Sequence, residues 1–463
     1  MTPAVWKKTA AIAGGLAVAG IVMLPPLSGM PPDGRKCLAM SLCAIVWWSA
    51  GAMHPGFTSM ALLLGFSLFL DPALVPGNMI FGIWTTPAMY LVVGGFLIAQ
   101  AVNESGFGRR LSLHFVRRFV RTYRGVIVSC YVLGFLLSFI IPHPWPRSFL
   151  LMSVMHNVIR EAHLTRGHAA NVGLAVFAGS VPTSMILLTG DSVLNPLMAG
   201  MAGGEVSYLN WLLYMGIPGV FASVATCWLQ LALFRPPAVF ALDPAEIDGQ
   251  IRELGGLSAR EKHTIAILGA GILLWVTDSL TGIHPGWIAL MCVLAFAMPF
   301  VGVLGPKSWH HVNMGTLLFL CAALAVGAVG GATGMNAWLA GALLPHPDGG
   351  GVASFMTVAV LVCVVLHMFL GSTMAVIGIA GPAIIEYGVA TGVSAMVAAM
   401  TVYFALVLHW LFPFHHMNIL VGLGEDAGGF GDGPVVKFGI FQTLVMAATC
   451  VAGALWWEVA GLL

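Results

Sequence analysis

The sequence predicts an all-α membrane protein with about eleven transmembrane helices, two re-entrant hairpins and an inverted internal repeat. Four observations predict this fold. Of the 463 residues, 59% are hydrophobic and 8% are charged, whereas an ordinary soluble domain has roughly 25% charged residues. Apolar runs long enough to cross a bilayer recur along the whole chain. Two further apolar segments are broken near their middle, and several short motifs occur twice in the same order.

Each uninterrupted apolar run predicts one span, because a helix of about 20 apolar residues matches the hydrocarbon thickness of a bilayer. The first run follows Lys7 and Lys8 and resembles a signal peptide. No clear small-residue cleavage site follows it, so we expect it to remain as the first helix. The predicted spans lie near residues 8–25, 37–53, 56–71, 84–102, 169–200, 207–233, 263–281, 285–303, 313–331, 394–423 and 438–461.

The two interrupted segments, 123–160 and 352–388, predict the re-entrant hairpins. PHPWPRS breaks the first segment and FLGSTM breaks the second. Proline lacks a backbone donor and ends helices, and unwound backbone is tolerated at membrane depth only where protein encloses it or a water-filled cavity meets it. We therefore expect both tips to lie in the protein interior. Two full spans joined by a short external loop remain the alternative.

Lysine and arginine residues predict the orientation, because they collect in short cytoplasmic loops. With the N-terminus in the cytoplasm, only Arg35 and Lys36 fall outside, Arg147 falls within the membrane, and the other basic residues fall inside. The same orientation holds if the first hairpin is two full spans. The expected location is the inner (plasma) membrane of a bacterium, as a multi-pass integral protein.

Paired motifs indicate an internal duplication. MHPG at 53–56 recurs as IHPG at 283–286, and NESGFGRRL at 103–111 has a weaker counterpart in GATGMNAWL at 331–339. A shared order of motifs at a nearly constant offset indicates a repeat. An odd number of crossings before the second copy predicts that it is inverted. Inverted repeats with broken helices that meet at mid-membrane are typical of secondary transporters.

Other function classes find little support in the sequence. The eight cysteines are scattered through apolar runs without a CxxC pair, and the net charge is +1. These features argue against a disulfide or cysteine–metal framework and against nucleic-acid binding. No GxxxxGK[ST] signature is present, so ATP-driven transport is not indicated.

Long stretches of the chain resemble the divalent anion/sodium symporter family. DPALVPGNMIFGIWTTPAMYLVVGGFLIAQAVNESGFGRRLSLHFVRRF resembles its fourth span and the following interfacial helix, and GLSAREKHTIAILGAGILLWVTDSLTGIHPGWIAL resembles its linker and seventh span. The resemblance implies a homodimer in which a transport domain moves as an elevator against a scaffold domain. It divides the chain into scaffold spans 1–4 (1–122), the first hairpin with spans 5 and 6 (123–233), a cytoplasmic linker (234–262), scaffold spans 7–9 (263–351), and the second hairpin with spans 10 and 11 (352–463).

The resemblance also implies where the site lies. In the family a Ser-Asn-Thr triplet marks each hairpin tip, and this chain lacks both triplets: the aligned residues are Pro142, His143 and Pro144 at one tip and Ser372, Thr373 and Met374 at the other. The turns in the two broken spans become 192–195 and 415–418, of which Asn195 and Asn418 keep the family residue. Because prolines, methionine and imidazoles offer sodium few oxygen ligands, the coupling ion stays open between sodium and protons.

Arg147 is the predicted centre of the site, because an intramembrane arginine is costly unless it is functional or paired. It offers a planar fork of donors to an oxyanion. A structural pair with Asp191 is the alternative. The predicted substrate-binding residues are Arg147, His143, Asn195, Ser372, Thr373 and Asn418, and the predicted ion- or proton-coupling residues are Asp191, Ser192, His415 and His416.

These features predict a secondary active transporter and not an enzyme. The expected substrate is a small anion (a carboxylate, a sulfonate or similar), coupled to sodium or protons or moved by exchange. No cofactor is expected beyond such a coupling ion, and the expected partners are the bilayer and a second copy of the chain. The alternative is an integral-membrane metal carrier or metalloenzyme that uses His143, His409, His415 and His416, because histidine is a common metal ligand.

Overall fold

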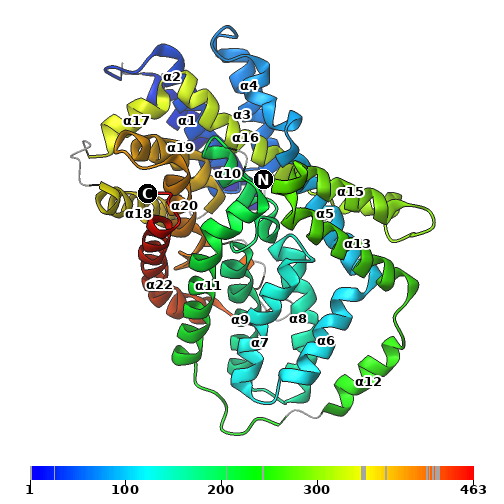
Figure 1. Ribbon diagram of the computed structural model, residues 1–463. Coiled ribbons are helices and arrows are strands. Elements are labelled where there is room, and N and C mark those ends of the chain that lie inside the picture. Colours follow the sequence, from blue (N-terminus) through cyan, green and yellow to red (C-terminus); the bar gives the residue numbers. More distant parts are fainter. Residues whose placement is uncertain are drawn as a thin grey trace.

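The described part of the chain consists of helices and connections, without a strand (Figure 1). The computed structural model describes residues 3–24, 27–204, 206–241, 244–345, 351–370, 373–412, 415–416, 418–419, 422 and 428–463.

Among the described residues, thirteen helical elements precede the linker. They are α1 (Pro3–Met23), α2 (Pro32–Ser49), α3 (Pro55–Phe69), α4 (Gly77–Phe81), η1 (Gly82–Thr85), α5 (Pro87–Ser105), α6 (Phe107–Phe119), α7 (Tyr123–Ser138), α8 (Pro144–Glu161), α9 (Arg166–Ser184), η2 (Leu188–Asp191), α10 (Leu194–Met201) and α11 (Tyr208–Leu233).

In the described part of the linker there is one helix, and the other described helices follow it. They are α12 (Pro244–Leu254) in the linker, then α13 (Ala259–Val276), α14 (Asp278–Thr281), α15 (Pro285–Ala297), η3 (Pro306–His311), α16 (Met314–Ala332), α17 (Met335–Leu343), α18 (Gly351–Leu370), α19 (Thr373–Ala390), α20 (Ala395–Val407) and α22 (Asp432–Val459).

The two copies of the His-Pro-Gly motif begin equivalent helices with the same cap. His54 precedes α3 and accepts a hydrogen bond at Nδ1 from Gly56 N at 3.2 Å. His284 precedes α15 and accepts from Gly286 N at 3.0 Å. In both copies proline occupies the first helical position, where no backbone donor is needed. The weaker motif pair also matches, since Gly106 and Gly334 both adopt left-handed backbone at the junctions α5–α6 and α16–α17.

The halves of the chain interlock through these helix starts. α3 packs along α16, and α15 packs along α5. Glycine permits the close approach in each pair: a Cβ at Gly56 would lie 2.9 Å from Gly315 Cα, and a Cβ at Gly286 would lie 2.0 Å from the Pro87 carbonyl oxygen. Each half therefore supplies one helix to a pair that the other half completes.

Breaks in the helices fall where the sequence predicts them. α7 ends at Ser138 and α8 begins at Pro144, so the break comprises residues 139–143, and the PHPWPRS segment (142–148) spans the end of the break and the start of α8. α18 ends at Leu370 and α19 begins at Thr373, and residues 371 and 372 lie outside the described residues. The predicted span 169–200 divides into α9, η2 and α10. Re-entrance of the two hairpins stays a prediction.

Helix length identifies fewer membrane spans than the apolar runs of the sequence predict. Among the described helices, five are long and apolar enough to cross a membrane, and the bent pair α4/η1 and α5 makes a sixth. Other predicted spans are shorter helices such as α15 and α20, with 13 residues each. Such a helix rises only about 20 Å, less than the hydrocarbon core. The count of eleven stays a prediction.

The linker is anchored to α6, and Figure 1 shows α12 beside α6 at one end of the molecule. Arg110 donates Nη1 and Nη2 to the carbonyls of Gly255 (2.9 Å) and Leu254 (3.0 Å) and forms an ion pair with Glu261. Glu261 also closes a capping box with Ser258 at the start of α13. Burial raises the pKa of Glu261, but the hydrogen bonds from Arg110 and Ser258 and the charge of Arg110 outweigh burial, so the pKa lies below its usual range.

Candidate functional site

The first hairpin break is organised by a histidine cap. His143 precedes α8 and accepts a hydrogen bond at Nδ1 from Trp145 N at 3.2 Å, as His54 and His284 do at their own helices. Its ring stacks on Phe96 of α5, with 5.1 Å between ring centroids. His143 therefore caps α8 and faces α5, and it is not part of the histidine group described below.

Arg147 lies one turn into α8 and is fully buried. It donates Nη1 to the carbonyls of Ile141 (3.3 Å) and Gly190 (3.2 Å) and Nη2 to the carbonyl of Ser180 (3.0 Å). The guanidinium thus joins the hairpin break to α9 and to the η2 break. Its Nε has no hydrogen-bond partner among the described residues. No ion pair between described residues joins Arg147 to Asp191.

Asp191 and Ser192 hold the break in the fifth predicted span. Asp191 accepts hydrogen bonds at Oδ1 from Val193 N and Leu194 N, both at 3.0 Å, so its carboxylate caps α10. Ser192 N donates to the Pro142 carbonyl at 2.9 Å, which ties this break directly to the hairpin break. The Ser192 hydroxyl is buried against Gly95 of α5 and has no partner in the described chain.

The side-chain amide of Asn195 is fully hydrogen-bonded within the protein. Its Nδ2 donates to the carbonyls of Ser184 (2.9 Å) and Leu187 (2.8 Å), and its Oδ1 accepts from the Tyr403 hydroxyl of α20. These bonds fasten the unwound backbone between α9 and η2 to the second half of the chain. Asn195 therefore shapes the break and has little capacity left for a ligand.

Asn418 connects the second break to the first hairpin. Its Nδ2 donates to Ser180 Oγ on α9 and contacts Ser148 Oγ on α8 at 3.4 Å, while its Oδ1 has no partner among the described residues. Ser148 is also hydrogen-bonded to Ser180, with 2.9 Å between the hydroxyl oxygens. Arg147, Ser148, Ser180 and Asn418 thus form one buried polar cluster, built from α8, α9 and the segment after α20.

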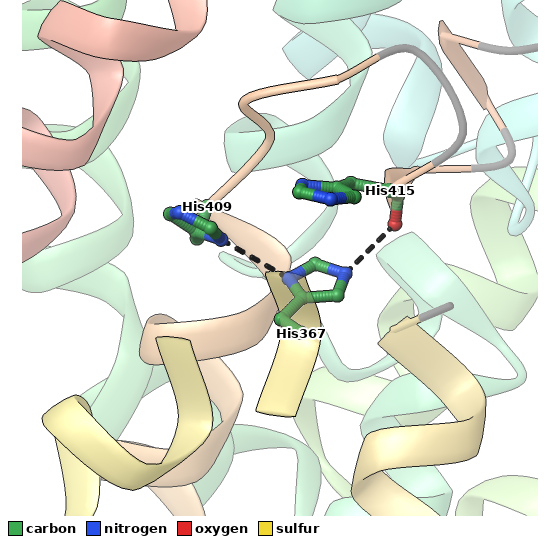
Figure 2. A group of neighbouring side chains, drawn as sticks. All are labelled: His367, His409 and His415. Carbon is green, nitrogen blue, oxygen red and sulfur yellow. Dashed lines mark hydrogen bonds between the residues drawn. The ribbon is translucent and has the colours of Figure 1, made fainter. Parts of the chain in front are cut away.

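Three buried histidines form a second polar group, shown in Figure 2. His367 comes from the end of α18, and His409 and His415 come from the segment after α20. The Nδ1 atoms of His367 and His409 lie 3.2 Å apart, and His367 Nε2 lies 3.0 Å from the His415 carbonyl oxygen. Thr373, at the start of α19, donates its hydroxyl to the same carbonyl at 2.8 Å.

The structure thus brings the predicted site residues together in two places. Arg147, Asp191, Ser192, Asn195 and Asn418 surround the first hairpin break and the polar cluster. Thr373 and His415 belong to the histidine group, whereas His416 accepts from Asn418 N at 3.3 Å and is not a member of that group. Ser372 lies outside the described residues.

Sequence reasoning missed Ser148, Ser180, Tyr403 and the importance of His367. The serines lie in apolar helices, where a hydroxyl most often bonds its own helix backbone, so no local pattern marks them. His367 was detectable, since it is a histidine near the end of an apolar arm, five residues before Ser372.

A cavity of about 610 Å³ lies between α5, α16 and α17 on one side and α10 and α19 on the other. Thr86, His284, Asn336 and Glu386 supply its polar lining. The predicted site residues do not line it, but Leu188 and Pro196 of the same broken span do. In the orientation predicted from charge, the loops at the cavity face the outside. Glu386 is a further cavity residue that the sequence reasoning did not select.

The model of the sodium:sulfate symporter transmembrane region matches residues 4–463. The chain belongs to this family. The family match confirms the resemblance noted from the sequence and identifies the chain as an integral membrane transporter.

Named transporters share low identity with this chain over most of its length. The citrate/succinate antiporter of Escherichia coli (strain K12) is 24% identical over 416 residues, 83% of this chain and 83% of that protein. The chloroplastic dicarboxylate transporter 1 of Arabidopsis thaliana is 22% identical over 478 residues, 98% of this chain and 83% of that protein.

Solved transporter structures share the fold. The Alcanivorax borkumensis YdaH transporter superposes with a TM-score of 0.57 at 14% identity, covering 88% of this chain and 99% of that one. Neisseria gonorrhoeae MtrF gives a TM-score of 0.50 at 14% identity, covering 97% of this chain and 94% of that one. The prediction of an all-α membrane transporter fold is therefore confirmed.

Proposed function

We propose that this protein is a secondary active transporter for a small carboxylate or a similar anion, such as a sulfonate. One observation carries the proposal. Two buried donors, Arg147 Nε and Ser192 Oγ, have no partner among the described residues, and both lie where the hairpin break meets the break of the fifth span. Buried donors are nearly always hydrogen-bonded. An anion oxygen is a suitable partner for each of these donors.

The names of the relatives support the carboxylate class. Citrate, succinate and dicarboxylates are named for the E. coli and A. thaliana relatives. The guanidinium of Arg147 is fixed by three carbonyls, so it is held in place before a ligand arrives. A fixed arginine loses little conformational entropy on binding.

The proposal includes an elevator motion and a route to the site. The cavity between α5, α16, α17, α10 and α19 separates helices assigned to the scaffold from helices assigned to the transport unit. Movement of one unit along this boundary would carry the breaks across the membrane. Substrate would enter from outside through the cavity. Coupling to sodium, to protons or by exchange is left open.

We also propose that the protein is a homodimer that assembles through spans 1–4 and 7–9. It lies in a bacterial inner membrane, with the N-terminus in the cytoplasm. The molar mass in mild detergent, measured by light scattering with the detergent contribution subtracted, tests the assembly. A single-chain mass would contradict it.

Uptake into proteoliposomes tests the function. Purified protein is reconstituted, and radiolabelled succinate, citrate, malate and an organic sulfonate are offered under a sodium gradient, a proton gradient, or with unlabelled anion inside. We expect uptake of at least one anion to exceed that of empty liposomes and to collapse when the driving gradient is removed. Uptake at the level of empty liposomes in all three conditions would rule out the proposal for these anions.

The second function from the sequence, a metal carrier or metalloenzyme, is less favoured. Membership of a transporter family indicates transport and not catalysis. The nitrogens of the three histidines nevertheless lie close enough together to bind a metal ion.

A further inference from the structure

We propose that His367, His409 and His415 form a binding site for one divalent transition-metal ion, such as Zn²⁺. The inference goes beyond anion transport and does not depend on it. All three side chains are buried, with at most 2% exposure. They come from two segments that the fold brings together, the end of α18 and the chain after α20 (Figure 2).

The spacing of the nitrogens fits a metal site. Each histidine offers one ring nitrogen, and these three atoms lie within 4.8 Å of one another. Zinc–nitrogen bonds of about 2.0–2.1 Å place two nitrogens of a tetrahedral site about 3.3 Å apart. The Nδ1 atoms of His367 and His409 are already 3.2 Å apart. The third nitrogen moves inward by at most about 1.5 Å, which small side-chain rotations supply.

The hydrogen bonds of His367 fix its ligand atom. A carbonyl oxygen only accepts, so His367 Nε2, at 3.0 Å from the His415 carbonyl, carries the proton. In the neutral ring Nδ1 then has the lone pair, and this lone pair faces His409. Anchoring of the second ring nitrogen by a backbone carbonyl is typical of metal-bound histidine. Thr373 steadies the same carbonyl from the other hairpin arm.

The two other histidines adjust when the ion binds. His409 binds through Nδ1 once its proton resides on Nε2. His415 Nδ1 accepts a hydrogen bond from Leu411 N at 3.2 Å. When the ion binds, this ring gives up that hydrogen bond and coordinates the metal. Without a metal, the facing Nδ1 atoms of His367 and His409 require a proton between them.

The ligand set selects the class of ion. Neutral imidazoles suit Zn²⁺, Co²⁺, Ni²⁺ and Cu²⁺, whereas sodium, calcium and magnesium prefer oxygen. Three protein ligands leave a position for water or an anion oxygen. A bound ion would also link the end of α18 to the segment after α20, so it would stiffen the second hairpin against the second break.

Metal binding to the purified, untagged protein tests the inference. Chelator-treated protein in detergent is titrated with Zn²⁺ against a chromophoric chelator, and the visible spectrum is recorded with Co²⁺ in place of Zn²⁺. We expect one Zn²⁺ per chain and the intense Co²⁺ absorption of a tetrahedral site. His367→Ala and His409→Ala should each weaken Zn²⁺ binding at least tenfold, and Thr373→Val, which keeps every ligand, should weaken it by a smaller factor.

The matched control is His416→Ala, since His416 is buried in the same segment but outside the group. It should bind Zn²⁺ as the unmodified protein does. Absence of a tetrahedral Co²⁺ spectrum in the unmodified protein would overturn the inference, even if every histidine variant failed to fold. Undiminished Zn²⁺ binding by folded His367→Ala or His409→Ala would overturn it as well. Because no readout involves transport, failure of this site and failure of the proposed function remain distinguishable.

Discussion

Arg147 combines two roles at one side chain, since three of its five N–H donors hold the backbone and Nε–H, which has no partner among the described residues, is free to bind a ligand. Asp191, which the sequence offered as its partner, spends one carboxylate oxygen on the amides of Val193 and Leu194. A buried charge without a contacting counter-charge is costly. A substrate anion would compensate that cost, which gives the arginine a reason to be in the membrane.

We therefore expect Arg147→Lys to weaken substrate binding although the charge remains, because an ammonium cannot reach three carbonyls and a ligand together. Arg147→Gln should weaken binding further, by roughly 2–5 kcal/mol. Binding of the anion identified by uptake is measured by calorimetry, alongside thermal unfolding. Arg121→Gln, an exposed arginine before α7, is the control. Substrate binding by a folded Arg147→Gln at the unmodified affinity would make the arginine purely structural.

The sequence predicted only some of the residues that meet at the candidate site. The helix break and the buried position of Arg147 were predictable, because prolines and an arginine inside an apolar run are conspicuous. Asn418 was selected through the family resemblance, and its role in binding stays a prediction. The hydroxyls of Ser148 and Ser180 were not predictable, since their role arises only when α8, α9 and the segment after α20 meet. Asn195 was predicted as a ligand residue, but its amide is used by carbonyls that the break itself exposes. Its role as a substrate contact has no support from these hydrogen bonds.

At the level of helices, the glycines at the paired helix starts set the distance between neighbours. A Cβ at Gly286 would collide with the backbone oxygen of Pro87, and backbone cannot move away as a flexible side chain can. The same position allows ordinary helical backbone, so any cost of substitution comes from packing alone.

Gly286→Ala should destabilise the protein by about 1–3 kcal/mol through overpacking. Gly269→Ala is the matched control, because this glycine lies within α13 with no atom within 4 Å of an added Cβ. It should leave stability unchanged or raise it slightly, by up to about 1 kcal/mol. Unfolding in detergent, monitored by tryptophan fluorescence, measures both variants. Equal stability of the two would contradict the close packing of α15 on α5.

Helix starts were predicted better than helix lengths. The predicted spans 56–71, 285–303 and 394–423 begin within one residue of α3, α15 and α20, because each apolar run begins where its helix begins. Lengths such as the 13 residues of α15 and α20 were not predicted. Apolar runs continue past the helix ends there, because hydrophobicity reports burial and not hydrogen bonding.

For the molecule as a whole, the linker is a structural element. Its ion pair between Arg110 and Glu261 is nearly buried, with side-chain exposures of 11% and 5%, whereas the pair between Arg117 and Asp248 is 45% and 32% exposed. Hydrogen bonds from Asn157 on α8 and Arg109 on α6 also reach Gln250 in α12. The linker thus contacts helices assigned to both predicted domains.

Acid should release this linker. The pKa of Glu261 is lowered in the folded protein, so its contribution is fully present above the ordinary value of 4.5 and is lost as the pH falls through the lower folded value. Limited proteolysis between 234 and 262 should accelerate below about pH 4.5. Glu261→Gln should be cut faster already at pH 7, about tenfold, and show less acid dependence. Asp248→Asn, in an exposed pair worth about 0–1 kcal/mol, should change little. An unaltered pH profile for Glu261→Gln would assign the acid effect to another group.

The helix pairs that join the two halves constrain the order in which this protein assembles in the membrane. α3 and α5 leave the ribosome well before α16 and α15 exist, so they enter the bilayer without the neighbours that their glycine faces fit. α3 and α5 must therefore remain in lipid without their carboxy-terminal neighbours, in line with insertion preceding packing. A quality-control protease that recognises membrane helices without their packing partners would act on α3 and α5 during synthesis. Packing of α16 and α15 against them would then cover the exposed helix faces.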